Sequence, residues 1–425
     1  MQVERLRLAV LLARCALGAF LLLVSVGCAT QSLNRARTDF YSGRLDDAEA
    51  TLDRDRIPQR DEVLFLMERG TVRQMQGEYA ASSRDFIAAH DRLVELETRS
   101  ISRGAGSLIV NDNIRHFVGA PFERTLLHTL TAQNHFALGD WDNAAVEARR
   151  ILRSLDHESR LDFPDEPFSR YVAGLAFQFL DDPSNAALQF RFANDLVPHV
   201  RINPDSGRLR QEKTPPPKEK SEDTEESDDV EEESRIERIW PEPLPDREPD
   251  IPETWTDELV VLLHLGRAPR RQSVGRSPFS YRSPTYAEIY VEGRYVGRTY
   301  TLSDTAYLRA ETERVRALRE AARAVTRIVA KEAASEAVGR NTEPWVGDLM
   351  RFILFGLLEQ PDERHWGTLP RWLQVGRVAV PPSLSEYTLV FKDSRGREQR
   401  RVDVKESIQR RRNLAISSHR ELLAR

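Results

Sequence analysis

The sequence predicts a multidomain α+β protein, in which an all-helical N-terminal part precedes a small β-sandwich-like domain with inserted helices. Three observations support this fold class. A helix–turn–helix pattern of small and aromatic residues recurs between residues 30 and 210. An acidic, proline-rich stretch then interrupts the chain. Short segments that alternate apolar and polar residues follow near the C-terminus, as expected for antiparallel strands.

The clearest helical hairpin covers residues 168–198. Its turn is 181–185, where Pro183 fixes φ and Ser184 or Asn185 is available to cap the second helix. Small and aromatic residues recur at the spacing that two packed amphipathic helices require, at Gly174, Phe177, Ala186, Phe190 and Ala193.

Three similar turns precede this hairpin, at Gly43, Gly77 and Gly139. A glycine at such a place can end a helix in the left-handed conformation. Gly43 and Gly77 lie 34 residues apart, and the later intervals are longer, which predicts two interruptions. The pattern resembles the tetratricopeptide repeat, a unit of about 34 residues. The resemblance implies a tetratricopeptide-like solenoid, a fold that binds other molecules and rarely performs chemistry.

Stacked repeats leave a concave face that is lined by the first helix of each pair. We expect this candidate groove to carry apolar and amide side chains that suit an extended peptide or a partner helix. Equally, the face could pack against the C-terminal domain of the same chain. Its predicted residues are Leu64, Met67, Thr71, Gln74, Thr129, Gln133, Phe136, Tyr171, Leu175 and Gln178.

The N-terminus has the pattern of a secretory signal peptide over residues 1–27, with a basic start and a short apolar run. The clean apolar run, 15–26, is shorter than the roughly 20 residues that a spanning helix needs. Residues 25–28 resemble a bacterial lipobox, in which the cysteine is lipidated before cleavage, although Ser25 departs from the usual leucine. We therefore expect a lipid anchor on Cys28.

The residue after the lipidated cysteine favours one membrane. Ala29 occupies this position, where lipoproteins held in the inner membrane often have aspartate. We expect an outer-membrane lipoprotein that faces the periplasm, while inner-membrane anchoring and exposure at the cell surface stay open.

The domain limits follow from changes in composition. Nine of the twelve residues 222–233 are acidic and the stretch after them is rich in proline, so a solvated linker is expected. The predicted units are the signal peptide at 1–27, a helical repeat domain at 28–209, a disordered linker at 210–252 and an α+β domain at 253–425.

The last unit combines strands with a helical insertion. Residues 258–265 predict a buried strand, and 286–300 predict a hairpin about Glu292 and Gly293. Helices are expected at 303–338, capped by Ser303 or Asp304, and at 345–358, so the insertion covers 303–358. Four further strands are expected at 372–380, 387–392, 399–405 and 413–417.

Several stretches together, at 136–150, 258–271 and 359–382 with the arginine-rich helix, resemble an uncharacterised family of bacterial tetratricopeptide-repeat-containing lipoproteins. The resemblance implies the two-domain layout and the envelope location, and it implies no activity. From it, Arg364, His365 and Trp366 form a candidate functional cluster. The alternative is that Trp366 packs in a core while Arg364 pairs with neighbouring carboxylates.

The sequence shows no pattern for a cofactor or a metal, because glycine-rich loops and spaced ligand sets are missing. A formal net charge of −5 gives no reason to expect nucleic-acid binding. The only two cysteines, Cys15 and Cys28, lie at the N-terminus, which excludes thiol chemistry in the body of the protein.

These observations favour a non-enzymatic envelope lipoprotein that binds a protein or peptide partner, for example an accessory factor in cell-wall synthesis or envelope assembly. One alternative is an enzyme acting on peptidoglycan or polysaccharide through acidic residues of the C-terminal domain, which requires two carboxylates roughly 5 to 9.5 Å apart in a pocket. Another is a structural part of an export complex.

Overall fold

The computed structural model describes residues 31–54, 58–102, 116–197, 199–212, 247–268, 285–319, 321, 364–405 and 408–422. The signal peptide with Cys28, most of the expected linker and the apolar stretch 345–358 lie outside these residues. Within them the α+β class is confirmed, because helices fill the N-terminal half and mixed sheets fill the C-terminal part.

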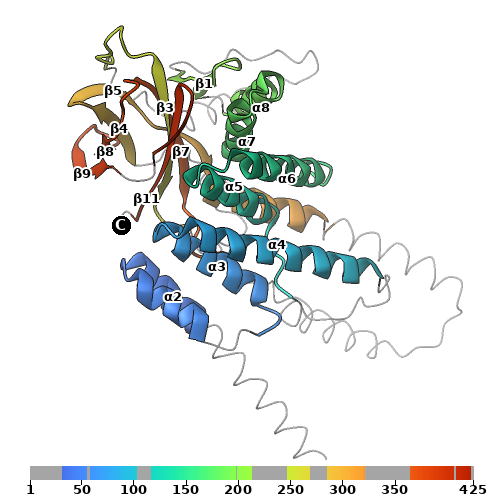
Figure 1. Ribbon diagram of the computed structural model, residues 1–425. Coiled ribbons are helices and arrows are strands. Elements are labelled where there is room, and N and C mark those ends of the chain that lie inside the picture. Colours follow the sequence, from blue (N-terminus) through green and yellow to red (C-terminus); the bar gives the residue numbers. More distant parts are fainter. Residues whose placement is uncertain are drawn as a thin grey trace, which may run out of the picture.

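The helices pair into successive hairpins (Figure 1). Each hairpin bends at a residue with positive φ, namely Gly43 (76°), Gly77 (80°), Gly139 (69°) and Asp181 (60°), the four turns found in the sequence. The first hairpin joins the helical residues 31–41 to α2. The helices are α2 (Leu45–Arg54), α3 (Glu62–Met75), α4 (Tyr79–Ser102), α5 (Pro121–Ala137), α6 (Trp141–Ser159), α7 (Pro167–Phe179) and α8 (Pro183–Leu196).

The cap of α8 differs from the expectation. Asp182 caps this helix, because its side-chain carboxylate accepts a hydrogen bond from the backbone N–H of Asn185 at 3.2 Å. The assignment of the cap to Ser184 or Asn185 was therefore wrong. Pro183 occupies the first helical position, which moves the cap one residue earlier. The turn before α6 repeats the arrangement with Asp140 and Asn143.

The chain turns to strands immediately after α8. The short hairpin of β1 (Val200–Ile202) and β2 (Leu209–Gln211) occupies residues that we expected to close the helical domain. Two larger sheets follow, with the orders β10-β11-β3-β7-β6 and β5-β4-β8-β9. Their strands are β3 (Asp257–Leu265), β4 (Thr285–Val291), β5 (Arg294–Arg298), β6 (Tyr300–Asp304), β7 (Trp372–Val380), β8 (Tyr387–Asp393), β9 (Glu398–Val404), β10 (Gln409–Arg411) and β11 (Leu414–Glu421).

The five-stranded sheet lies between the helices and the four-stranded sheet (Figure 1). Strand β3 shows this by its alternation: Val260 and Leu262 belong to the core shared with the helices, whereas Leu259 and Val261 belong to the core between the sheets. Because both faces are covered, the strand is apolar at nearly every position. The same alternation applies to β11, which pairs parallel to β3.

The expected helix at 303–338 begins later than the sequence suggested. Ser303 and Asp304 end strand β6, and the helix starts at residue 305. Asp304 still acts as the cap, since its Oδ1 accepts from the N–H of Ala306 at 2.8 Å. Ser303 instead bonds Glu166 of the helical half. The rest of the expected insertion, apart from residue 321, lies outside the described residues after 319.

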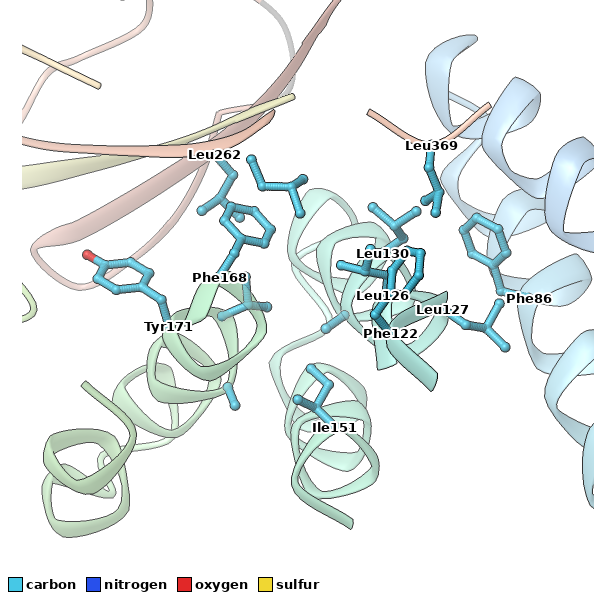
Figure 2. Packing of buried hydrophobic residues seen from close by; sticks show 14 of the residues in the cluster. Phe86, Phe122, Leu126, Leu127, Leu130, Ile151, Phe168, Tyr171, Leu262 and Leu369 are labelled. Atoms are coloured by element: carbon cyan, nitrogen blue, oxygen red, sulfur yellow. The ribbon is translucent and has the colours of Figure 1, made fainter. Parts of the chain in front are cut away.

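The helical half and the sheets share one hydrophobic core. Figure 2 shows Leu262 of β3 directed toward Phe168 of α7, and Leu369 directed toward the helices that carry Phe86 and Leu130. Each of these five side chains is fully buried. The two halves therefore form a continuous packed unit.

Candidate ligand cavity beside an occupied groove

The ten predicted groove residues lie on α3, α5 and α7, and the C-terminal half covers much of the face they form. All are buried except Gln74 and Gln178, which are partly exposed. Gln178 accepts a hydrogen bond from Arg377 of β7 at 3.0 Å. Of the two alternatives that the sequence left open, this arrangement is the one in which the chain's own C-terminal domain packs on the array.

The segment that lies in the groove carries the candidate cluster Arg364, His365 and Trp366. Trp366 is fully buried and donates its Nε1–H to Thr71 Oγ1 at 3.0 Å. Its ring packs edge-on against Phe86, with 5.6 Å between the centroids. Arg364 pairs with Asp61 at 2.7 Å, and the carbonyl of His365 accepts from Arg37. These three residues therefore anchor the segment in the groove.

Two buried glutamates of the helices hold the backbone of this segment. Glu68 of α3 accepts from the N–H groups of Gly367 at 2.8 Å and Thr368 at 3.1 Å, and it pairs with Arg37 at 2.7 Å. Glu123 of α5 accepts from the N–H of Trp366 at 3.0 Å. Hydrogen bonds to a buried carboxylate are stronger than neutral ones, so these contacts fix the segment in place.

A cavity of about 790 Å³ lies beside this segment, where the first helical hairpin meets α3, α5 and the ends of β3, β9 and β11. We call it the junction cavity. Both halves of the protein contribute its walls: Phe40, Tyr41, Ser42, Gly43, Thr71, Gln74, Met75, Tyr79, Gln133, His264, Arg400, Val402, Asp403, Val404, Lys405, Ser418, His419, Arg420, Glu421 and Leu422.

Four polar side chains of the cavity wall have buried atoms without a hydrogen-bond partner among the described residues. Both amide atoms of Gln133 lack one, as do Nε2 of His264, Nε of Arg420 and Nε2 of His419, which lies 3.7 Å from a carboxylate oxygen of Glu421. Gln133 is 2% exposed and His264 is 4% exposed. Arg420 and His264 are register neighbours on the parallel strands β11 and β3, which puts them side by side on the face toward the helices. Unpaired buried polar groups are rare and call for an explanation.

Arg420 is held without a carboxylate partner in the described part of the chain. Its Nη2 donates to the carbonyl of Thr368 at 2.8 Å, and its guanidinium lies over the ring of Phe40 at 5.6 Å. Burial lowers the pKa of Arg420 from its usual value. Burial also lowers the pKa of His264 to about 3, with the charges of Arg420 and His419 adding to the effect, so that imidazole is neutral at pH 7.

Two cations at the edge of the cavity are paired with glutamates, and a carboxylate there is bonded to a hydroxyl. Arg400 pairs with Glu421 at 2.7 Å, and Lys405 pairs with Glu386 at 3.0 Å. Asp403 accepts from Thr388 of β8 at 2.7 Å.

The two lining carboxylates are thus turned to different partners. Asp403 is held by a neighbouring strand and Glu421 by Arg400. Among the described residues, no cluster of histidine, aspartate or glutamate has the arrangement of a metal site.

Comparison with known proteins does not assign the chain. No family model matches it, and no curated protein matches it. The candidate site therefore depends on the geometry of the described residues.

Sequence reasoning found three residues of the cavity wall and missed His264 and Arg420. The three are Thr71, Gln74 and Gln133, which were expected in the groove and line the junction cavity. His264 could have been noticed, because it is the polar exception among apolar residues of like parity in β3, after Val260 and Leu262. Arg420 gave no signal, since the last strand was expected to end at 417 and the structure extends it to Glu421.

Proposed function

We propose that this chain is a lipid-anchored protein of the bacterial envelope that acts by binding, and that its ligand or partner enters the junction cavity. In this proposal the helical half is a tetratricopeptide-like array, and its groove holds a segment of the protein's own C-terminal half. The binding surface then combines the first hairpin, α3 and α5 with the ends of β9 and β11.

One observation carries this proposal. The segment in the groove is held by paired polar groups, such as the indole of Trp366 and the N–H of Gly367, whereas the adjoining cavity has buried polar groups from both halves that lack partners among the described residues. A ligand that forms hydrogen bonds with these groups gains free energy from them. Ligand sites commonly combine a concave, partly apolar surface with a few convergent polar groups.

The envelope location is proposed from Cys28 and the residues before it. No helix in the described ranges combines the length and apolarity needed to cross a membrane. Fractionation of cells that produce Cys28→Ser tests the anchor: the variant should leave the membrane fraction, and retention there at unchanged size would contradict it.

Site-specific photo-crosslinking in intact cells tests the binding surface. A photoreactive residue at position 405, which lines the cavity, should capture a specific adduct that mass spectrometry identifies. The matched control places the same residue at position 395, in the turn at the other end of β9. Equal adducts at both positions, or none at 405, would contradict binding at the junction cavity.

A further inference from the structure

We infer that the junction cavity binds a small monocarboxylate that also carries amide or hydroxyl groups. Arg420 would hold the carboxylate, and Gln133 would hold a neighbouring polar group. The inference rests on the proposed function, because it assigns a chemical class to the ligand of the same cavity.

The charged groups of the cavity wall favour a ligand with one negative charge. Arg400 and Lys405 are each compensated by a glutamate. Among the described residues, Arg420 makes no ion pair and contacts carbonyl oxygens, the hydroxyl of Tyr41 and an aromatic ring. Its guanidinium can hold one carboxylate, whereas Asp403, which lines the same cavity and is bonded to the hydroxyl of Thr388, would repel the additional charge of a phosphate with about −1.5 to −2.

The N–H donor that Arg420 leaves available also suits a carboxylate ligand. Nη2 is already engaged with Thr368 and Gly266, at 2.8 and 3.4 Å, while Nε is buried and unpartnered. A guanidinium binds carboxylates with directed N–H groups, and this interaction strengthens where water is excluded. Phe40 covers one face of the group, which leaves its edge for the ligand.

The neutral groups indicate what else the ligand carries. Within the described part of the chain, Gln133 offers an N–H donor and a carbonyl acceptor that both lack partners. It therefore matches a group with both functions, such as a peptide unit. His264 adds an uncharged imidazole nitrogen beside Arg420. A volume of about 790 Å³ accommodates a molecule the size of an acylated dipeptide.

Calorimetric titration of the full chain in detergent tests this assignment with three probes: N-acetyl-alanyl-alanine, its C-terminal amide and inorganic phosphate. The acid should bind at least about tenfold more tightly than the amide. Arg420→Gln and Gln133→Leu should each weaken binding of the acid by about tenfold or more. Arg401→Gln is the matched arginine control, because Arg401 lies on β9, pairs with Glu398 at 3.3 Å and does not line the cavity. This variant should bind as the unmodified protein does.

Equal binding of acid and amide, preferential binding of phosphate, or no binding of the acid at about 10 mM would overturn the inference. Circular dichroism checks that each variant is folded, and Gln133→Leu decides the outcome if Arg420→Gln is not. Adducts at position 405 without binding of the acid would overturn the carboxylate assignment alone. Missing adducts would overturn the proposed function itself.

Discussion

The filled groove and the junction cavity lie on the same helices, α3 and α5, yet they differ in whether their buried polar groups have hydrogen-bond partners. In the groove, Glu68, Glu123 and the indole of Trp366 all have partners supplied across the two halves. In the cavity, Gln133 and His264 have buried atoms without partners among the described residues. The comparison teaches that the polar groups of the groove hold the two halves together, whereas those of the cavity are available to a ligand.

Removing the indole of Trp366 should have the largest effect. Trp366→Ala empties a fully buried site and leaves Thr71 without its partner, so the free energy of unfolding should fall by about 3–5 kcal/mol. Chemical denaturation measures this loss. Leu188→Ala is the control, because Leu188 is 40% exposed and should change stability by less than about 1 kcal/mol. Similar losses in both variants would remove the distinction between groove and surface.

A smaller loss is expected from the carboxylate that holds the segment. Glu68→Gln removes the charge that accepts from Gly367, Thr368 and Arg37, which should cost about 2–4 kcal/mol. Glu62→Gln, on the same helix, changes a carboxylate that is 42% exposed and should cost about 0.5 kcal/mol or less. A loss below about 1 kcal/mol for Glu68→Gln would show that the segment is held by packing alone.

The buried imidazole of the cavity should make stability depend on pH. The pKa of His264 is lowered to about 3 by burial, whereas an unfolded histidine has a value near 6.5. Below pH 6.5 the unfolded chain binds a proton that the folded chain does not, so stability falls as pH decreases. From about pH 7.5 to 5, this residue should account for a loss of about 2 kcal/mol.

Urea unfolding of the wild type and of His264→Gln at both pH values checks this prediction. The variant should lose less stability than the wild type over the interval. His199 and His90, whose pKa values are also lowered to about 4 by burial, act in the same direction in both proteins and cancel from the difference. Equal losses in the two proteins would contradict the assignment to His264.

The smallest effect is expected in the cavity itself. Gln133→Leu replaces an amide without partners and should change stability by about 1 kcal/mol or less in either direction. Its neighbour Asn134 donates to Ser82 at 2.8 Å and accepts from Gln74 at 2.7 Å, so Asn134→Leu should destabilise clearly, by about 2 kcal/mol or more. If the two substitutions cost the same, the amide of Gln133 is not free.

The sequence predicted the elements well where local chemistry decides them. Glycines at 43, 77 and 139 marked turns because a left-handed residue ends each first helix, and strand β7 was expected at its observed bounds. The short strands β1, β2 and β10 have three residues each and were missed, since such segments carry little periodicity.

The site was harder to predict because it depends on contacts between distant parts of the chain. Trp366 lies 295 residues from Thr71, and no local pattern indicates that they meet. Arg420 and His264 become neighbours only through the parallel pairing of β11 with β3. The acidic linker gave no information on how the two halves meet, because the contacts between them come from segments on either side of it.

The central claim is that the helical half and the sheets unfold as one unit, joined by the segment that carries Trp366. Urea unfolding followed by far-ultraviolet circular dichroism, which reports on the helices, and by tryptophan fluorescence tests it most directly. We predict coincident transitions for the wild type, and a shift of both to lower urea in Trp366→Ala. Two separate transitions, with the helical midpoint unmoved by Trp366→Ala, would contradict the account.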